Sequence, residues 1–170
     1  MQHYILDFEL VPNTCHGQNL RTLLPRAEWQ AISRFVRNDA NGVCEICGRQ
    51  VNGISELECH EEWEYVKKKK RNGKVKRIQK LVGLKAVCPM CHAVKHIGFA
   101  AHAGIYDDAV DWFMQVNGST YKEFKQESDK AWKKQRKHSK HKWKLDCSAL
   151  DKLLESRGTE ISDIAREAVS

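Results

Sequence analysis

Two pairs of cysteines constrain this chain more than any other feature of its sequence. Cys44 and Cys47 form the first pair and Cys88 and Cys91 the second, and two residues separate the members of each pair. Cysteine thiolates at this spacing bind zinc, and two such pairs complete a tetrahedral site. The segment between the pairs must fold back on itself for the four sulfur atoms to meet. We therefore predict one structural Zn²⁺ held by all four cysteines.

A disulfide framework is the alternative interpretation of these cysteines. Disulfides persist in secreted proteins, and such chains begin with an apolar signal segment. The residues at the start of this chain, Met1 to Tyr4, do not resemble one. No apolar run is long enough to cross a bilayer either. We expect a soluble, cytoplasmic protein in a bacterial or phage-infected cell, with reduced thiols, bound zinc and no membrane partner.

The positive charge of the chain is concentrated in two segments. The formal net charge is +7, and nine Lys or Arg residues fall in 67–80, which holds no acidic residue, with ten more in 122–144. Such surfaces attract polyanions, so we expect a nucleic acid, DNA, as the partner. A solvated hairpin tip is the alternative for the first segment. In the first segment, the candidate nucleic-acid contacts are Lys67, Lys68, Lys69, Lys70, Arg71, Lys74, Lys76 and Arg77.

Hydrophobic periodicity predicts a fold that mixes strands and helices. Asn72-Gly73 is a turn signal between two apolar segments, which predicts a β-hairpin. Pro25 suits the first turn of a helix, and Ser148 can cap another. The expected elements are a strand over 4–12, a helix over 25–41, strands over 54–66 and 75–87, helices over 88–103, 105–116 and 121–143, a helix after 148 and a short one after 158.

Three histidines accompany the second cysteine pair and the hairpin. His60 lies in the first predicted hairpin strand, and His92 and His96 follow Cys91 in the predicted helix. A strand with His, a returning strand and Cys-x-x-Cys-His leading into a helix resembles the HNH endonucleases, the zinc-supported ββα-metal nucleases, over 43–98. The chain is also similar to a family of small, poorly characterised bacterial and phage HNH-like proteins. The segments that carry this second similarity are Val11-Pro12, Asn19 to Arg21, Cys59 to Trp63 and Leu81 to Leu84.

The resemblance implies both a fold and an activity. The fold is α+β: a small zinc-stabilised, treble-clef-like ββα-metal core with flanking helices and an N-terminal strand. The activity is hydrolysis of DNA phosphodiester bonds with Mg²⁺ or another divalent ion at the active site. His60 matches the general base and His92 the helix histidine that holds this metal. His96 shares a helical face with His92 and is a second candidate ligand, while Lys95 is a candidate phosphate contact.

The chain then divides into four expected parts. These are an N-terminal strand and helix that pack on the core (1–42), the zinc-binding HNH-like ββα core (43–103), a basic helical extension (104–147) and a C-terminal helical tail (148–170).

Two positions depart from the HNH pattern. Gly83 stands where the family has an asparagine that orients the base, and glycine has no side chain for that task. Cys59 stands where the family has Asp or His, and a thiolate is a poor ligand for Mg²⁺. Glu58 and Glu61 are the alternative sources of a carboxylate. Cys59 itself can be a fifth thiol near the zinc, a buried strand residue or a ligand of a second site.

Three classes of function fit these features. The first is a metal-dependent HNH endonuclease that acts on DNA, which His60, His92 and the basic hairpin favour. The second is a catalytically degenerate HNH-like zinc module that binds nucleic acid, which Gly83 and Cys59 favour. The third is a module that binds a protein partner, for instance a phage-encoded regulator or inhibitor of a host enzyme.

Overall fold

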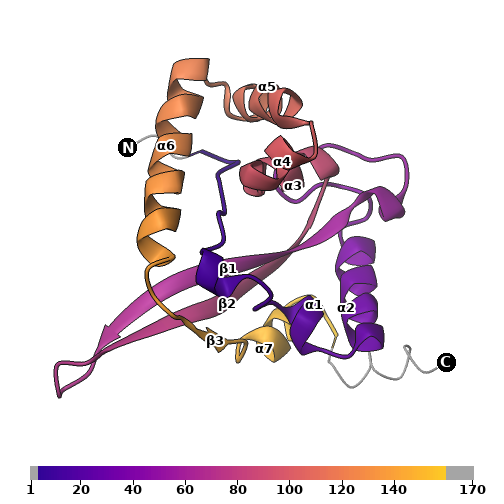
Figure 1. The fold of residues 1–170 in the computed structure, drawn as a ribbon. Helices are drawn as coiled ribbons and strands as arrows, with labels where there is room; N and C mark the ends of the chain where they lie inside the picture. Colours follow the sequence, from indigo (N-terminus) through magenta and orange to yellow (C-terminus); the bar gives the residue numbers. More distant parts are fainter. Residues whose placement is uncertain (1–3, 160–170) are drawn as a thin grey trace.

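A long β-hairpin runs through the middle of the molecule, and the helices are arranged around it (Figure 1). The structure is a computed structural model of the chain, and it describes residues 4–159. Strand β1 (Glu58–Lys69) pairs antiparallel with β2 (Val75–Val87), and the short β3 (Lys144–Asp146) lies parallel to β2. The fold is therefore α+β, as predicted, with a small sheet in the order β1-β2-β3.

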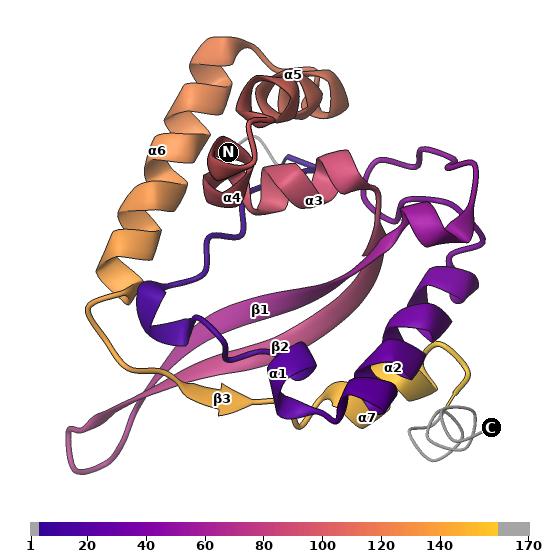
Figure 2. The ribbon, with the colours of Figure 1, turned by 45° about the vertical axis from the view of Figure 1, so that its right-hand side comes forward.

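The tip of the hairpin projects away from the helices (Figures 1 and 2). Residues 67–76 are all exposed to solvent. The turn lies at the predicted place, where Gly73 takes a positive φ of 78°, a conformation that glycine adopts without steric cost. The other end of the hairpin is buried among the helices, since Leu81, Ala86 and Val87 are fully buried.

Helices α3, α4 and α5 lie together at this buried end (Figure 1). The helix expected over 88–103 is two helices, because the backbone at His96 leaves the helical region with φ −110° and ψ 50°. α5 ends where the sequence predicts, at a left-handed Gly118 with φ 58°. The bounds are α3 (Pro89–Lys95), α4 (Ile97–His102) and α5 (Tyr106–Asn117).

The long basic helix is shorter than the sequence predicts. α6 (Tyr121–His138) starts at a capping box between Thr120 and Glu123 and ends before Trp143. Trp143 leaves the helix because its indole packs on Tyr65 of β1, with ring centroids 5.1 Å apart, and donates a hydrogen bond to the carbonyl oxygen of His138. The chain then runs along β2 as β3, a strand that the sequence analysis missed.

The remaining helices lie at the other side of the hairpin (Figure 2). α2 (Arg26–Asp39) buries Ile32 and Val36, and Pro25 stands just before its first turn rather than within it. α7 (Leu150–Glu155) has Ala149 as its N-cap, so the expected cap at Ser148 is wrong; the Ser148 amide donates a hydrogen bond to Asp146 instead. The short helix expected after 158 lies outside the described residues. The other elements are η1 (Asn13–Cys15), α1 (Leu20–Leu23) and η2 (Ile54–Glu56).

The predicted N-terminal strand is wrong: residues 4–12 form an extended segment without a strand partner. Side-chain and helix groups take the hydrogen bonds that a neighbouring strand would have made. The Asn117 amide binds both the N–H and the carbonyl of Leu6, and the Glu9 amide donates to the carbonyl of Lys95 at 2.8 Å. The apolar alternation nevertheless predicts burial correctly at Leu6, which is fully buried.

The core joins all these parts. Side chains from the extended segment, α2, the hairpin and α3 to α7 form one buried hydrophobic cluster. No helix among residues 4–159 combines the length and apolarity that a membrane span requires. The division of the chain into four parts stays a prediction.

Candidate metal centres

The four predicted zinc ligands come together at the buried end of the hairpin. One sulfur from each of Cys44, Cys47, Cys88 and Cys91 lies within 4.8 Å of the others. The Sγ atoms of Cys47 and Cys88 are 3.9 Å apart. The four cysteines are thus close enough together to hold a metal ion such as zinc, and four thiolates are a donor set that zinc prefers.

Backbone pairing between the two cysteine pairs explains why they meet. The amide of Glu45 donates to the carbonyl of Ala86 at 2.9 Å, and the Glu45 carboxylate accepts from the amide of Ala86 at 2.6 Å. This fixes the first pair beside the end of β2. The second pair begins directly after β2, because Cys88 follows Val87 and precedes the first turn of α3, which contains Cys91.

Close packing of the thiols changes their proton affinities. Hydrogen bonds from Cys88 and Cys91 hold the pKa of Cys44 far below its ordinary value. The same contacts raise the pKa of Cys88 to about 11 and also raise that of Cys91. Cys44, Cys88 and Cys91 therefore do not gain and lose protons independently of one another. A divalent ion takes the place of these protons when it binds.

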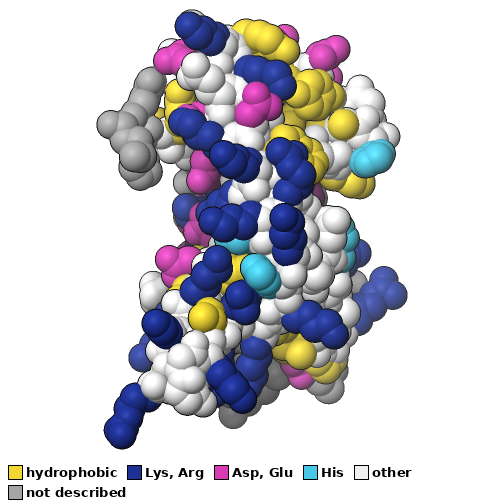
Figure 3. Space-filling view, turned by 60° about the vertical axis from the view of Figure 1, so that its left-hand side comes forward, with side chains coloured by type: hydrophobic (Ala, Val, Ile, Leu, Met, Phe, Trp, Pro, Cys, Tyr) yellow, Lys and Arg dark blue, Asp and Glu magenta, His cyan; other side chains and the backbone are white. Residues whose placement is uncertain are grey.

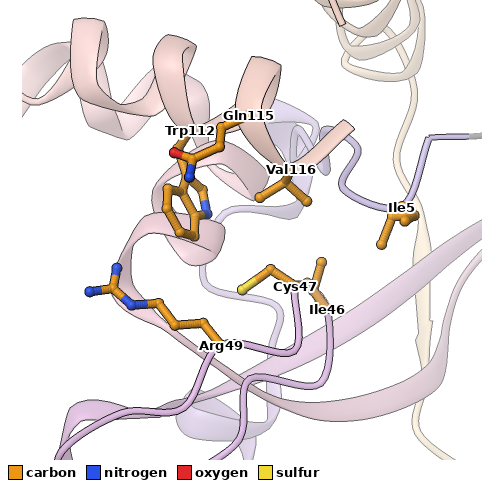
Figure 4. A pocket seen from close by; sticks show the side chains of 7 residues that line it. All are labelled: Ile5, Ile46, Cys47, Arg49, Trp112, Gln115 and Val116. Carbon is orange, nitrogen blue, oxygen red and sulfur yellow. The ribbon is translucent and has the colours of Figure 1, made fainter. Parts of the chain in front are cut away.

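Trp112 supports the cysteine cluster from α5. Its indole Nε1 donates a hydrogen bond to Sγ of Cys91 at 3.3 Å, and the guanidinium of Arg49 lies 5.5 Å from its ring centroid. Figure 4 shows both side chains beside Cys47 at the edge of a hollow, which Ile5, Ile46, Gln115 and Val116 complete. The sequence analysis missed Trp112, because nothing in the local pattern of α5 points to a sulfur 21 residues earlier.

A second cluster consists of the three histidines. One ring nitrogen from each of His60, His92 and His96 lies within 4.8 Å of the others. Their ring centroids are 4.8 to 5.4 Å apart. They reach this point from β1, from α3 and from the break between α3 and α4. The fold thus brings together the predicted base and the two predicted metal ligands.

Two carboxylates that were not among the predicted site residues orient these imidazoles. Nε2 of His60 donates to Oε2 of Glu9 at 3.0 Å, and the other oxygen of Glu9 accepts from the amide of Trp63 at 2.7 Å. Nδ1 of His92 lies 2.8 Å from Oε2 of Glu58. Ligating histidines characteristically donate their second ring N–H to a carboxylate. The sequence analysis named Glu58 only as an alternative carboxylate and missed Glu9.

Burial keeps one member of the cluster neutral. Desolvation, with the nearby rings of His92 and His60, lowers the pKa of His96 to about 3. The neutral imidazole is the form that binds metals. The pKa of Glu58 is lowered instead, chiefly because it accepts the hydrogen bond from His92. The site therefore combines a neutral ring with a carboxylate that stays ionised.

Lys95 faces away from solvent. Its side chain is 8% exposed, and its ammonium pairs with Asp7 of the extended segment. Burial lowers the pKa of Lys95, but Asp7, together with the nearby Glu9 and Glu62, raises the pKa overall. A phosphate contact by Lys95 would require this pair to open, so that role stays a prediction.

The two positions that depart from the HNH pattern are outside the histidine cluster. A Cβ on Gly83 would lie 2.3 Å from Oε2 of Glu62, so the Glu62 side chain fills the space over the glycine. Cys59 belongs to neither cluster in the described part of the chain. Burial raises its pKa to about 12, which keeps it a neutral thiol. Glu61 binds elsewhere, to the amide of Leu20.

The remaining cysteines are separate from both clusters. Cys15 is buried and Cys147 is partly buried, and both are free thiols. Burial raises the pKa of each.

A search among known protein families, curated proteins and solved structures finds no match for this chain.

Proposed function

We propose that this protein is a metal-dependent endonuclease of the HNH type that hydrolyses phosphodiester bonds in DNA. The observation that carries the proposal is the convergence of His60, His92 and His96 beside the cysteine cluster. In sequence order, the hairpin and α3 give strand, strand and helix, which is the arrangement that the HNH resemblance implies. The cysteine cluster then fixes the first turn of α3, which carries His92 and ends just before His96.

The donor set of the histidine cluster favours a transition metal. Imidazole suits Zn²⁺, Ni²⁺ and related ions, whereas Mg²⁺ prefers oxygen ligands. The expectation of Mg²⁺ at this site therefore has no support in the residues present. A divalent ion held by the three histidines supplies stabilisation of the charge that develops on the phosphate.

His60 has two candidate roles at such a site. Its side chain is 2% exposed and meets the other two rings, which favours a ligand. Its hydrogen bond to Glu9 also fits a general base, because a carboxylate in that position orients the imidazole and stabilises its charged form. The metal content of His60→Ala separates these roles. If His60 is a ligand, the variant binds one metal ion fewer per chain; if His60 is a base, the metal content is unchanged.

The basic hairpin tip supports nucleic acid as the substrate. All the predicted contacts from Lys67 to Lys76 are exposed, and Arg77 is partly buried. A cationic ribbon on the same small chain as a metal-ligand cluster with a candidate base supports a nuclease.

The test is a cleavage assay on purified, zinc-loaded protein. Supercoiled DNA is incubated with Mn²⁺, Ni²⁺, Zn²⁺ or Mg²⁺, and nicked and linear products are separated on a gel. We expect cleavage with the transition metals and a loss of about 10² to 10⁴ in rate for His60→Ala, the range that general-base catalysis supplies. A wild-type protein that cleaves neither DNA nor RNA with any of these ions contradicts the proposal.

A second candidate is a nucleic-acid-binding zinc module without catalysis. The side chain that fills the space over Gly83 and the neutral thiol of Cys59 favour it, because neither position keeps the residue of the HNH pattern. Salt-dependent DNA binding without cleavage in the same assay would select this candidate.

A further inference from the structure

The two basic segments of the chain form one surface. The first is the hairpin tip, and the second is the end of α6 with the residues that follow it. Figure 3 shows Lys and Arg side chains in a band along the face of the molecule that α6 presents. We call this set the basic surface; its members are Lys67, Lys68, Lys69, Lys70, Arg71, Lys74, Lys76 and Arg77 on the hairpin, and Lys133, Lys134, Arg136, Lys137, Lys140, Lys142 and Lys144 beyond the middle of α6.

Aromatic packing joins the two halves. The ring of His138, at the end of α6, lies 5.3 Å from Tyr65 of β1 and 4.8 Å from Trp143. β3 then runs parallel to β2, with Lys144 beside Ile78. The end of α6 thus packs against the hairpin just before its exposed tip.

Cations from both halves of the basic surface lie close enough to the same two histidines, His138 and His141, to lower their pKa values. Besides burial, Lys134 of α6 and Lys67 of the hairpin lower the pKa of His138. Besides desolvation, Arg77 and Lys67 of the hairpin act together with Lys140 to lower the pKa of His141. The positive potential is therefore continuous across the junction.

The charges of the basic surface are not neutralised within the protein. Among residues 4–159, none of its side chains forms an ion pair with a carboxylate, and Asp146 lies at its edge, near Lys80 and Lys68. The first half of α6 differs, because Lys125 pairs with Asp129 and Lys130 pairs with Glu127. A surface of unpaired cations attracts an anionic partner.

The shape of the hairpin tip selects among nucleic acids. The major groove of B-form DNA admits a two-stranded β-ribbon, whereas the deep, narrow major groove of an RNA duplex does not admit side chains. Single strands are bound on aromatic platforms, and 67–77 contains no aromatic residue. We propose that the hairpin tip enters the major groove of a DNA duplex while the end of α6 contacts the adjacent phosphates. This inference takes from the proposed function only the assumption that the partner is a nucleic acid.

Two matched variants on the same helix test the α6 half. Lys133→Gln/Lys134→Gln/Lys137→Gln removes three cations of the basic surface, and Lys122→Gln/Lys125→Gln/Lys130→Gln removes three exposed cations of the first half as the control. Binding to a labelled DNA duplex is followed by fluorescence anisotropy across a salt series, without added divalent ions, and the duplex is checked for cleavage afterwards. We expect the first variant to reduce the salt slope by about 0.9 for each phosphate that it no longer neutralises, and the control to reduce it less. Equal slopes for the two variants would overturn the inference.

The role of the hairpin tip is tested by comparing the affinity of the protein for a DNA duplex with its affinity for an RNA duplex and other anionic partners. We expect wild type to bind the DNA duplex more tightly than an RNA duplex, a single strand or phosphatidylserine vesicles at the same salt. Lys68→Gln/Lys69→Gln/Lys70→Gln/Arg71→Gln should remove the preference for DNA over RNA, whereas the α6 variant should keep it. Equal wild-type binding to both duplexes, or tighter binding to the vesicles, overturns groove entry. A protein that binds DNA duplexes without cleaving them contradicts only the proposed nuclease activity.

Discussion

Nε2 of His60 donates a hydrogen bond to Oε2 of Glu9 at 3.0 Å, across 51 positions of the chain. The second oxygen of Glu9 is held by the amide of Trp63, so the carboxylate cannot rotate freely away from the imidazole. Gly83 has no side chain to orient a histidine, and Glu9 supplies this support from outside the predicted core. The extended N-terminal segment is therefore part of the candidate site.

Removal of the Glu9 carboxylate should weaken metal binding at the histidine cluster. Loss of such an outer partner typically lowers metal affinity by about 10- to 100-fold. We expect this loss in Glu9→Ala and a smaller one in Glu9→Gln, because the amide oxygen can still accept the hydrogen bond. Co²⁺ is titrated into protein that carries one Zn²⁺ per chain, so that the cysteine cluster is filled and the histidine cluster is free, and its visible absorption is followed.

The matched control for Glu9 is Glu64→Ala, which removes an exposed carboxylate from β1, the strand that carries His60. It should bind Co²⁺ as wild type does, and both variants should keep their zinc. Unchanged Co²⁺ affinity in Glu9→Ala would show that this carboxylate does not support the site.

The cysteine cluster should hold the central part of the fold together. Cys44→Ser and Cys88→Ser each remove one sulfur, and both should lose bound zinc and cooperative thermal unfolding, because binding energy at such sites is folding energy. Elemental analysis and circular dichroism measure the two effects. Cys147→Ser, outside the cluster, should change neither. Folded, reduced wild-type protein without zinc would contradict this assignment.

The sequence predicted those parts of the molecule that local patterns determine. The returning strand was predicted with its ends at Val75 and Val87, because apolar residues and a turn signal lie next to each other in the chain. The two cysteine pairs and the three histidines were found by spacing, and the fold brings both sets together.

Residues that act across long sequence separations were not predicted. Glu9 and Trp112 support the clusters through single contacts with residues 51 and 21 positions away, and no periodicity marks such contacts. The alternation over 4–12 correctly indicated an extended segment, but it could not show that Asn117 takes the place of a strand partner.

Gly83 should tolerate a side chain only if Glu62 moves. The Cβ of Glu62 would lie 3.3 Å from a new Cβ, and its carboxylate would have to leave the 2.9 Å ion pair with Lys85. We expect Gly83→Asn to lower the free energy of unfolding by about 1 kcal/mol, from crowding and loss of a partly exposed ion pair. Urea denaturation of Gly83→Asn, Glu62→Ala and the double variant gives the free energy of interaction between positions 62 and 83. Additive effects would show that the two side chains do not compete for this space.

The distance from the histidine cluster to the hairpin tip should set a minimum substrate length. His60 and Lys69 are nine residues apart on β1, and a strand of this length spans at most about 30 Å. One turn of B-form DNA covers about 34–36 Å, or 10–10.5 base pairs. A duplex cleaved at the histidines and held at the tip must therefore extend nearly one turn beyond the cleaved bond on that side.

We expect duplexes with less than about one turn, roughly 10 base pairs, on that side to be cleaved with a higher KM and an unchanged kcat. The tip contacts the ground state and the transition state alike, so its loss weakens binding without slowing the chemical step. Steady-state kinetics on a set of duplexes shortened from one end measures this. Lys68→Gln/Lys69→Gln/Lys70→Gln/Arg71→Gln should show the high KM at every length, since its tip no longer binds phosphates. A wild-type KM that does not change with duplex length would mean that the tip and the histidine cluster do not engage the same duplex.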